Sequence, residues 1–232
     1  MKTFFKYSAT FLLLAGIAFA AYIWWLLQPR PMPQPMPAEL LAITTSEGSA
    51  LLAAADHTAD HAALHATWES QELVSFCGVA SGVTVVNALG GSVAQGDFFT
   101  PEASRVRSRM QVTFGGMSLP DLAGLLSAHG LDVELVHARE SSTEAFRTAL
   151  EQNLSTPGDY LLVNYQREVL GQGRVGHISP VSAYDSASDR VLILDTASYK
   201  YPYTWVPVPM LFEAMLQVDP ATGKSRGYLA VN

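Results

Sequence analysis

Residues 71–89 read QELVSFCGVASGVTVVNAL and include Cys77, the only cysteine of the 232-residue chain. The small and β-branched residues after Cys77 continue up to a glycine pair at 90–91. Their apolar positions recur at helical spacing, which predicts one buried helix that begins at Cys77, although the valines would also suit a strand. A thiol at a helix N-terminus meets unpaired backbone N–H groups, which favour the nucleophilic thiolate. We therefore interpret Cys77 as a nucleophile, with an inert buried cysteine as the alternative.

The composition narrows the class of protein. A net charge of −7 argues against a nucleic-acid partner, because such a partner requires a basic surface. A single cysteine excludes an intrachain disulfide and a multi-cysteine metal cluster. The length suits one domain with a sizeable core, once an N-terminal segment is set apart.

The N-terminal segment is apolar. Residues 7–27 carry no charge and are long enough to cross a bilayer as a helix, and two lysines precede them. The positive-inside rule then places the rest of the chain outside the cytoplasm. Residues 1–27 are therefore predicted to be a membrane anchor, and a signal peptide cleaved at the A-x-A-like residues 18–20 is the alternative.

A proline-rich linker, QPRPMPQPMP at residues 28–37, is predicted to be extended and to lead into a domain over residues 38–232. The beginning of that domain is alanine-rich and predicted to be helical, with His57, His61 and His65 at helical spacing. Three imidazoles on one helical face could bind a metal, as the paired histidines of zinc helices do. Histidines at such spacing more often form a solvent-exposed face of a helix, so we assign no metal ligands.

The rest of the chain divides into a helical part and a β part. Helical patterns cover residues 119–129 and 142–154, whereas residues 95–116 are predicted to form a loop or lid. The runs that predict strands are residues 160–165, 177–184, 191–194 and 228–231. Helices followed by strands predict an α+β domain whose site lies where the two parts meet.

A cysteine nucleophile needs a base, an acceptor that orients the base, and donors for the oxyanion. His177 is the candidate base, because it opens a strand next to glycines that leave room for a substrate. Asp195 ends the next predicted strand, and an antiparallel hairpin with a DSASD turn would bring its carboxylate beside the imidazole. Gln71, six residues before Cys77, could supply an oxyanion donor. The order Gln, Cys, His, Asp follows the logic of papain-like cysteine peptidases.

Four stretches carry a more specific resemblance. They are FCGVASGVTVVNALG at 76–90, VTFGG at 112–116, GHISPVSAYDSASDRVLILDTASYKYPYTWVPV at 176–208 and TGKSRGY at 222–228. In this order they resemble the catalytic domain of phytochelatin synthases, including the shorter bacterial forms. The separation of 18 residues between His177 and Asp195 and the KYP-x-x-W segment at 200–205 make the resemblance specific.

The resemblance implies a papain-like α+β fold, in which a helical half precedes an antiparallel β half. It also implies that Cys77, His177 and Asp195 form a catalytic triad and that Gln71 is the oxyanion donor. The substrate would be glutathione: attack on its Cys–Gly amide releases glycine and leaves a γ-glutamylcysteinyl thioester on Cys77. Water then yields γ-glutamylcysteine, and a second glutathione yields a phytochelatin. Arg226 matches a family arginine that could pair with a substrate carboxylate. Further substrate-binding candidates are Tyr199, Lys200 and Tyr201.

The sequence departs from the family pattern in two places. Plant and cyanobacterial members usually carry an arginine three residues after the triad aspartate, where this chain has Ser198, so one substrate-binding charge is missing. The sequence ends at Asn232 without a cysteine-rich region, which leads us to expect hydrolysis rather than metal-driven polymerisation.

Two other functions stay open from the residues alone. One is a papain-like peptidase that acts on another peptide, and the other is a non-enzymatic metal- or thiol-binding module. No cofactor is required for the expected chemistry, although cadmium or zinc could enter as the metal–thiolate form of the substrate. The expected location is a bacterial inner membrane, with the domain on the periplasmic side, or the periplasm after signal-peptide cleavage. A homodimer is also left open.

Overall fold

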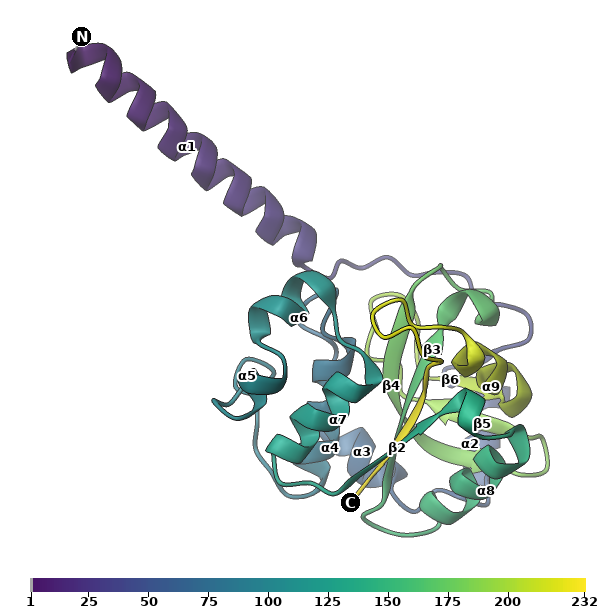
Figure 1. Cartoon of the computed structure of the whole chain (residues 1–232). Helices are drawn as coiled ribbons and strands as arrows, with labels where there is room; N and C mark the ends of the chain where they lie inside the picture. The colour runs from purple at the N-terminus through teal and green to yellow at the C-terminus, as the bar shows by residue number, and fades with distance from the viewer. Residues whose placement is uncertain (1) are drawn as a thin grey trace.

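One seven-stranded antiparallel sheet forms the centre of the molecule, and helices lie on both sides of it (Figure 1). The computed structural model describes residues 2–232, with side chains described from residue 12 onward. The helices are α1 (Lys2–Leu27), α2 (Ser46–Ala54), α3 (His61–Thr67), α4 (Cys77–Ala88), α5 (Ala103–Val106), α6 (Arg109–Gly115), α7 (Leu119–Ala128), α8 (Thr143–Asn153), α9 (Val208–Leu216) and the 3₁₀ turns η1 (Ala138–Glu140) and η2 (Arg167–Leu170). The strands are β1 (Leu41–Ala42), β2 (Val133–His137), β3 (Tyr160–Gln166), β4 (Gly176–Asp185), β5 (Arg190–Ile193), β6 (Thr204–Pro207) and β7 (Gly227–Val231), in the spatial order β1-β6-β5-β4-β3-β7-β2.

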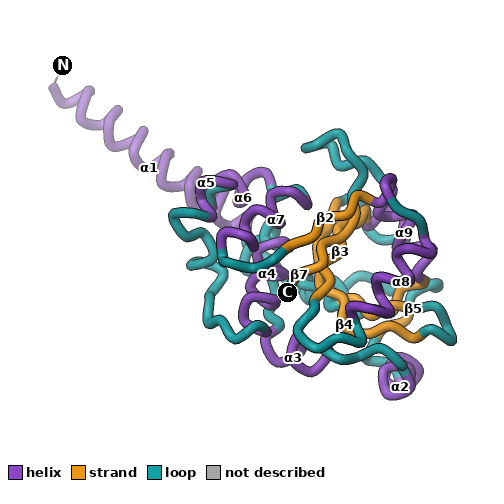
Figure 2. Tube along the Cα trace, turned by 60° about the horizontal axis from the view of Figure 1, so that its bottom comes forward, coloured by secondary structure: helices purple, strands orange, loops and turns teal. Residues whose placement is uncertain are grey.

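Each face of the sheet is covered by its own layer of helices (Figure 2). The buried residues of α4 and α7 belong to one apolar core, and those of α8 and α9 belong to another. Side chains alternate along a strand, so Leu162 on β3 joins the first core while Leu161 and Val163 join the second. Burial on both faces explains why the strands of the second half are continuous apolar runs.

The α+β prediction is confirmed, including the helix that begins at Cys77. The helices predicted over residues 119–129 and 142–154 are α7 and α8, and Ser142 caps α8 by accepting a hydrogen bond from the Ala145 N–H. The four predicted strands are β3, β4, β5 and β7. The valines of α4 are compatible with a helix because residues 78–86 are all buried and packing outweighs propensity.

Two regions differ from the prediction. Residues 95–116 contain α5 and α6 rather than only a loop, because Ser108 and Gln111 form a capping box that starts α6. The alanine-rich beginning of the domain is helical only in α2 and α3. Strands β1, β2 and β6 and helix α9 were not predicted, and each of these strands pairs with a segment distant in the sequence.

Helix α1 covers residues 2–27 of the predicted anchor, and the first part of that anchor, residues 1–11, lies outside the residues with described side chains. In the described part of the chain, no helix has both the length and the apolar character required to cross a membrane. The structure therefore does not support the predicted transmembrane anchor.

The proline-rich segment 28–37 has no regular secondary structure and lies along the domain. The Met32 N–H donates to the Tyr199 carbonyl at 2.8 Å, and the Gln34 N–H donates to the Lys200 carbonyl at 3.0 Å. These bonds bring the segment next to the chain that follows β5. It is thus part of the folded surface near Asp195 rather than a detached spacer.

Candidate active site

Cys77 is the first residue of α4 and is partly buried. Ser81, one turn later, donates its hydroxyl to the Cys77 carbonyl at 2.7 Å and to the Ile178 carbonyl at 3.1 Å, which ties the start of the helix to β4. Gly78 lets Met117 pack directly on the helix, because an added Cβ would overlap the Met117 side chain. The thiol is therefore fixed at a helix N-terminus that faces the strand carrying His177.

His177 and Asp195 lie together on the β4–β5 hairpin. The His177 Nε2 is 3.0 Å from Asp195 Oδ1, and both side chains are almost fully buried. Because Asp195 accepts the Nε2–H, the other ring nitrogen, Nδ1, is the one available to the thiol. Asp195 Oδ1 also accepts the Ala197 N–H at 2.9 Å, which fixes the carboxylate next to the strand end.

Arg167 is a buried partner of Asp195 that the sequence analysis missed. One guanidinium nitrogen donates to both Asp195 carboxylate oxygens at 2.7 Å, and another donates to Gln172 Oε1. The guanidinium also lies over the rings of Tyr165 and Tyr201, with only 2% of the side chain exposed. Burial alone would raise the pKa of Asp195, but the charges of Arg167 and His177 keep this pKa well below its usual range. The carboxylate therefore stays ionised beside His177.

The electrostatic surroundings of Cys77 favour the thiolate. Burial alone would raise the pKa of the thiol, but the hydrogen bond and the positive charge of His177, with a further contribution from Arg167, lower it below the usual value. A thiolate beside an imidazolium is the reactive form of a cysteine nucleophile. The hydrogen bonds thus run from Arg167 through Asp195 to His177, which lines the same pocket as Cys77.

Cys77 and His177 line a pocket of about 380 Å³, which also contains Arg226 and Asn164. The Arg226 Nη1 donates to Asn164 Oδ1 at 2.7 Å, while the Arg226 Nε and the Asn164 Nδ2 are buried with no hydrogen-bond partner among the described residues. Unpaired buried donors are costly, so both are suited to an acceptor such as a carboxylate. Gly176 leaves room for the guanidinium, since a Cβ there would lie 2.5 Å from Arg226 Nη1.

The other predicted substrate-binding and oxyanion residues do not line this pocket. The Gln71 Nε2 donates to the carbonyls of Leu73 and Val74, at 3.0 and 2.9 Å. Tyr201 is buried against Arg167, and the Lys200 ammonium lies 5.5 Å from the Tyr199 ring centroid. The oxyanion role of Gln71 and the substrate contacts of Tyr199, Lys200 and Tyr201 stay predictions.

The histidine stripe makes three separate contacts. His57, His61 and His65 each pair a ring nitrogen with a different hydroxyl, those of Ser155, Ser182 and Tyr203. His61 and His65 also stack, with ring centroids 5.9 Å apart. These imidazoles connect α3 and the loop before it to the turn after α8, to β4 and to the residue before β6.

Comparison with known proteins assigns the chain to a family. The family model for phytochelatin synthase matches residues 32–228, which include every residue of the site described above. The chain belongs to the phytochelatin synthase family. Among its relatives, glutathione gamma-glutamylcysteinyltransferase 1 of Lotus japonicus is 33% identical over 171 residues, and the protein of the same name in Arabidopsis thaliana is 32% identical. Both alignments cover 71% of this chain, and 34% and 35% of the respective relative.

A more distant phytochelatin synthase relative is the glutathione gamma-glutamylcysteinyltransferase of Schizosaccharomyces pombe, 28% identical over 166 residues. That alignment covers 69% of this chain and 40% of the yeast protein. The chain thus spans roughly a third of the length of the curated relatives it matches. The match includes the segment with Cys77, His177 and Asp195, so the site belongs to the part shared with the family model.

Two functional candidates in this phytochelatin synthase domain had a signal that the sequence analysis did not use. Asn164 interrupts the apolar run YLLVNY, and Arg167 is the second residue after that run. A polar or charged residue within or next to a fully buried strand requires a partner. The pattern could have identified both as buried polar residues, but not their partners.

Proposed function

We propose that this protein is a thiol acyltransferase that cleaves the Cys–Gly amide of glutathione. The observation that carries the proposal is a thiol of lowered pKa at the start of α4, in contact with a buried His177–Asp195 pair and in one pocket with an unpaired Arg226 donor. The names of the relatives support glutathione as the substrate and the γ-glutamylcysteinyl group as the group transferred. A thiol at a helix start opposite a His–Asp pair on a sheet supports a papain-like arrangement of the fold.

In the first step the Cys77 thiolate attacks the carbonyl carbon of the Cys–Gly amide. A C–S bond forms, the C–N bond breaks, and the leaving glycine amine takes a proton from the His177 imidazolium. The product is a γ-glutamylcysteinyl thioester on Cys77 and free glycine. Asp195 stabilises the imidazolium before the transfer and keeps the ring oriented.

In the second step an acceptor attacks the thioester. Neutral His177 takes a proton from water or from the amine of a second glutathione, and the C–S bond breaks to regenerate the thiolate. Water yields γ-glutamylcysteine, and the amine yields a peptide longer by one γ-glutamylcysteine unit. Cadmium or zinc would take part as a thiolate complex of glutathione, and therefore as substrate.

Arg226 is the proposed anchor for the acyl portion of the substrate. Its unpaired Nε–H and the nearby Asn164 amide can receive the α-carboxylate of the γ-glutamyl group, which stays on the enzyme after glycine leaves. This contact would position the scissile carbonyl at Cys77.

The test is to incubate the full-length protein with glutathione, with and without cadmium, and to quantify glycine, γ-glutamylcysteine and longer peptides by mass spectrometry. We expect glycine release that is abolished in Cys77→Ala and weakened in Arg226→Lys, mainly through KM. The ratio of γ-glutamylcysteine to longer peptides measures hydrolysis against transfer. Folded protein that releases no glycine would refute glutathione cleavage and favour another peptide substrate, with Ser198 as the first position to change.

We also propose that the domain acts outside the cytoplasm, because Lys2 and Lys6 precede the apolar N-terminal segment. A reporter fused after Asn232 that is active only outside the cytoplasm would support this location. Reporter activity confined to the cytoplasm would contradict it.

A further inference from the structure

A second hollow in the molecule is separate from the thiol site. It is a groove of about 670 Å³ between β2 and α8, and it shares no lining residue with the pocket of Cys77. Its floor includes Leu161, which belongs to the core under α8 and α9, whereas Cys77 packs against the core of α4 and α7. The groove therefore opens on the other face of the sheet, and its volume is in the range of small-molecule sites.

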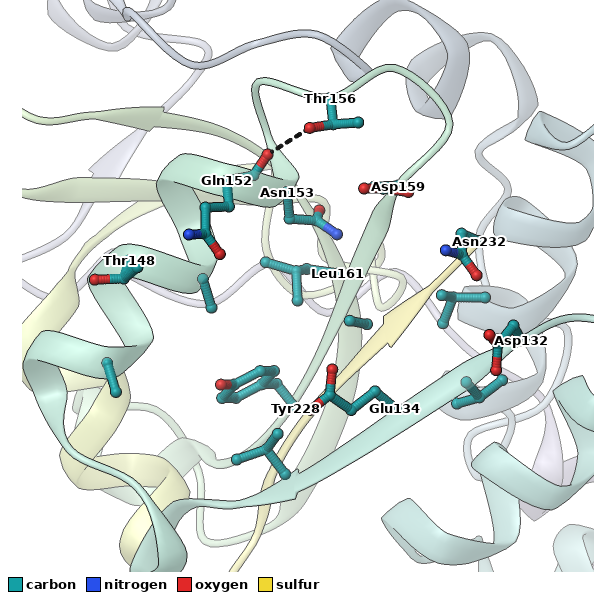
Figure 3. Close-up of a pocket in the computed structure, with 16 residues that line it drawn as sticks. Asp132, Glu134, Thr148, Gln152, Asn153, Thr156, Asp159, Leu161, Tyr228 and Asn232 are labelled. Carbon is teal, nitrogen blue, oxygen red and sulfur yellow. Dashed lines mark hydrogen bonds between the residues drawn. The ribbon is translucent and has the colours of Figure 1, made fainter.

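The groove is lined by acidic side chains and by no basic one. Asp132, Glu134 and Asp159 line it, together with amide and hydroxyl side chains. None of the three carboxylates forms a salt bridge with a side chain of residues 12–232. Figure 3 shows them around the hollow, with Asp132 and Glu134 on the β2 side and Asp159 near the start of β3. The negative charge of the groove would attract a positively charged ligand.

A buried amide provides a second and independent indication of a ligand. Asn153, the last residue of α8, is only 8% exposed, and its Oδ1 has no hydrogen-bond partner among the described residues. In Figure 3 its side chain points into the groove above Leu161. An unpaired buried acceptor is costly, so this oxygen calls for an N–H or O–H donor. It accepts hydrogen bonds, as the carboxylates do.

The arrangement favours an organic cation over a metal ion. No group of three or more metal-ligating side chains converges in the described part of the chain, and Asp159 comes from a different segment than Asp132 and Glu134. Between them lie apolar surfaces of Leu161, Ala230 and the Tyr228 ring. Amines separated by methylene groups would match this alternation, since methylenes pack on the floor and an ammonium can lie on an aromatic ring.

We propose that the groove between β2 and α8 binds a linear aliphatic polyamine. Its ammonium groups pair with Asp132, Glu134 and Asp159, and one N–H donates to Asn153 Oδ1. This site is independent of the function proposed for Cys77.

The test is calorimetric titration of the full-length protein with spermidine at an ionic strength of about 150 mM, where unspecific surface attraction is largely screened. We expect saturable binding that Glu134→Gln and Asn153→Leu each weaken about fivefold or more, which corresponds to roughly 1 kcal/mol. Asn153→Asp retains an acceptor and should keep the affinity, which separates a lost contact from a damaged helix. The matched control is Glu151→Gln, which removes one charge from the exposed face of α8 outside the groove and should leave the affinity unchanged.

Two results would overturn the proposal. One is the absence of saturable spermidine binding by the folded protein. The other is binding that Glu151→Gln weakens as much as Glu134→Gln, or that Asn153→Leu leaves unchanged, since either would mean attraction to the net charge alone.

Discussion

Replacing Arg167 with leucine removes the buried partner of Asp195 while leaving the triad residues in place. Arg167 donates to both carboxylate oxygens at 2.7 Å and is 2% exposed, so the variant leaves a buried carboxylate with only His177 and one backbone N–H. Removing one partner of a buried ion pair typically costs about 3–5 kcal/mol. We expect Arg167→Leu to lower the free energy of unfolding by about that amount in urea titrations.

A surface pair provides the matched control. Arg147 also forms two hydrogen bonds to a carboxylate, that of Asp189, at 3.0 and 2.7 Å and through two of its nitrogens, but both side chains are about 30% exposed. Solvent screening reduces such a pair to about 1 kcal/mol or less. Arg147→Leu should therefore change stability little, although the chemistry removed is the same.

The variant also tests whether Arg167 acts through Asp195 on the thiol. The charge of Arg167 lowers the pKa of both Asp195 and Cys77. Its loss should shift the pH midpoint of Cys77 alkylation by iodoacetamide upward, which a merely structural residue would not do. Because the folded pKa of Asp195 is depressed, its stabilising contribution is present above about pH 4 and lost as the pH falls below that value. Arg167→Leu should lack this acid-dependent loss. Unchanged stability together with an unchanged alkylation profile would refute the reasoning.

Three further predictions concern the thiol and two glycines. Wild-type Cys77 should be alkylated with a pH midpoint below the ordinary thiol value of 9.0, and a midpoint at or above that value would contradict the thiolate assignment. Gly176→Ala places a Cβ 2.5 Å from Arg226 Nη1. The variant should raise the KM for glutathione while changing the melting temperature little. An unchanged KM would argue against Arg226 as the anchor of the substrate. In Gly227→Ala the added methyl group overlaps the Val136 carbonyl across the β7–β2 pair. Thermal unfolding should show that the free energy of unfolding falls by about 1–3 kcal/mol or more. A variant as stable as the wild type would mean that β2 and β7 move apart at no cost in stability.

The partners of the buried charges in the site could not be predicted from the sequence. Arg167 and Asp195 are 28 residues apart, and Arg226 and Asn164 are 62 residues apart. Periodicity describes which face of an element is buried, but it does not say which distant group meets a buried charge.

The sequence by itself determined the elements whose signals are local. The helix at Cys77 followed from apolar spacing and a glycine stop, and the β4–β5 hairpin followed from two β-prone runs around the DSASD turn. That hairpin was enough to place Asp195 beside His177. Only the tertiary structure decided which groups surround this pair, how the proline-rich segment lies on the domain, and where an acidic groove opens on the other face. The physical reason is that hydrogen-bonded turns and periodic burial are encoded within a few residues, whereas the compensation of buried charge depends on segments that meet only in the folded chain.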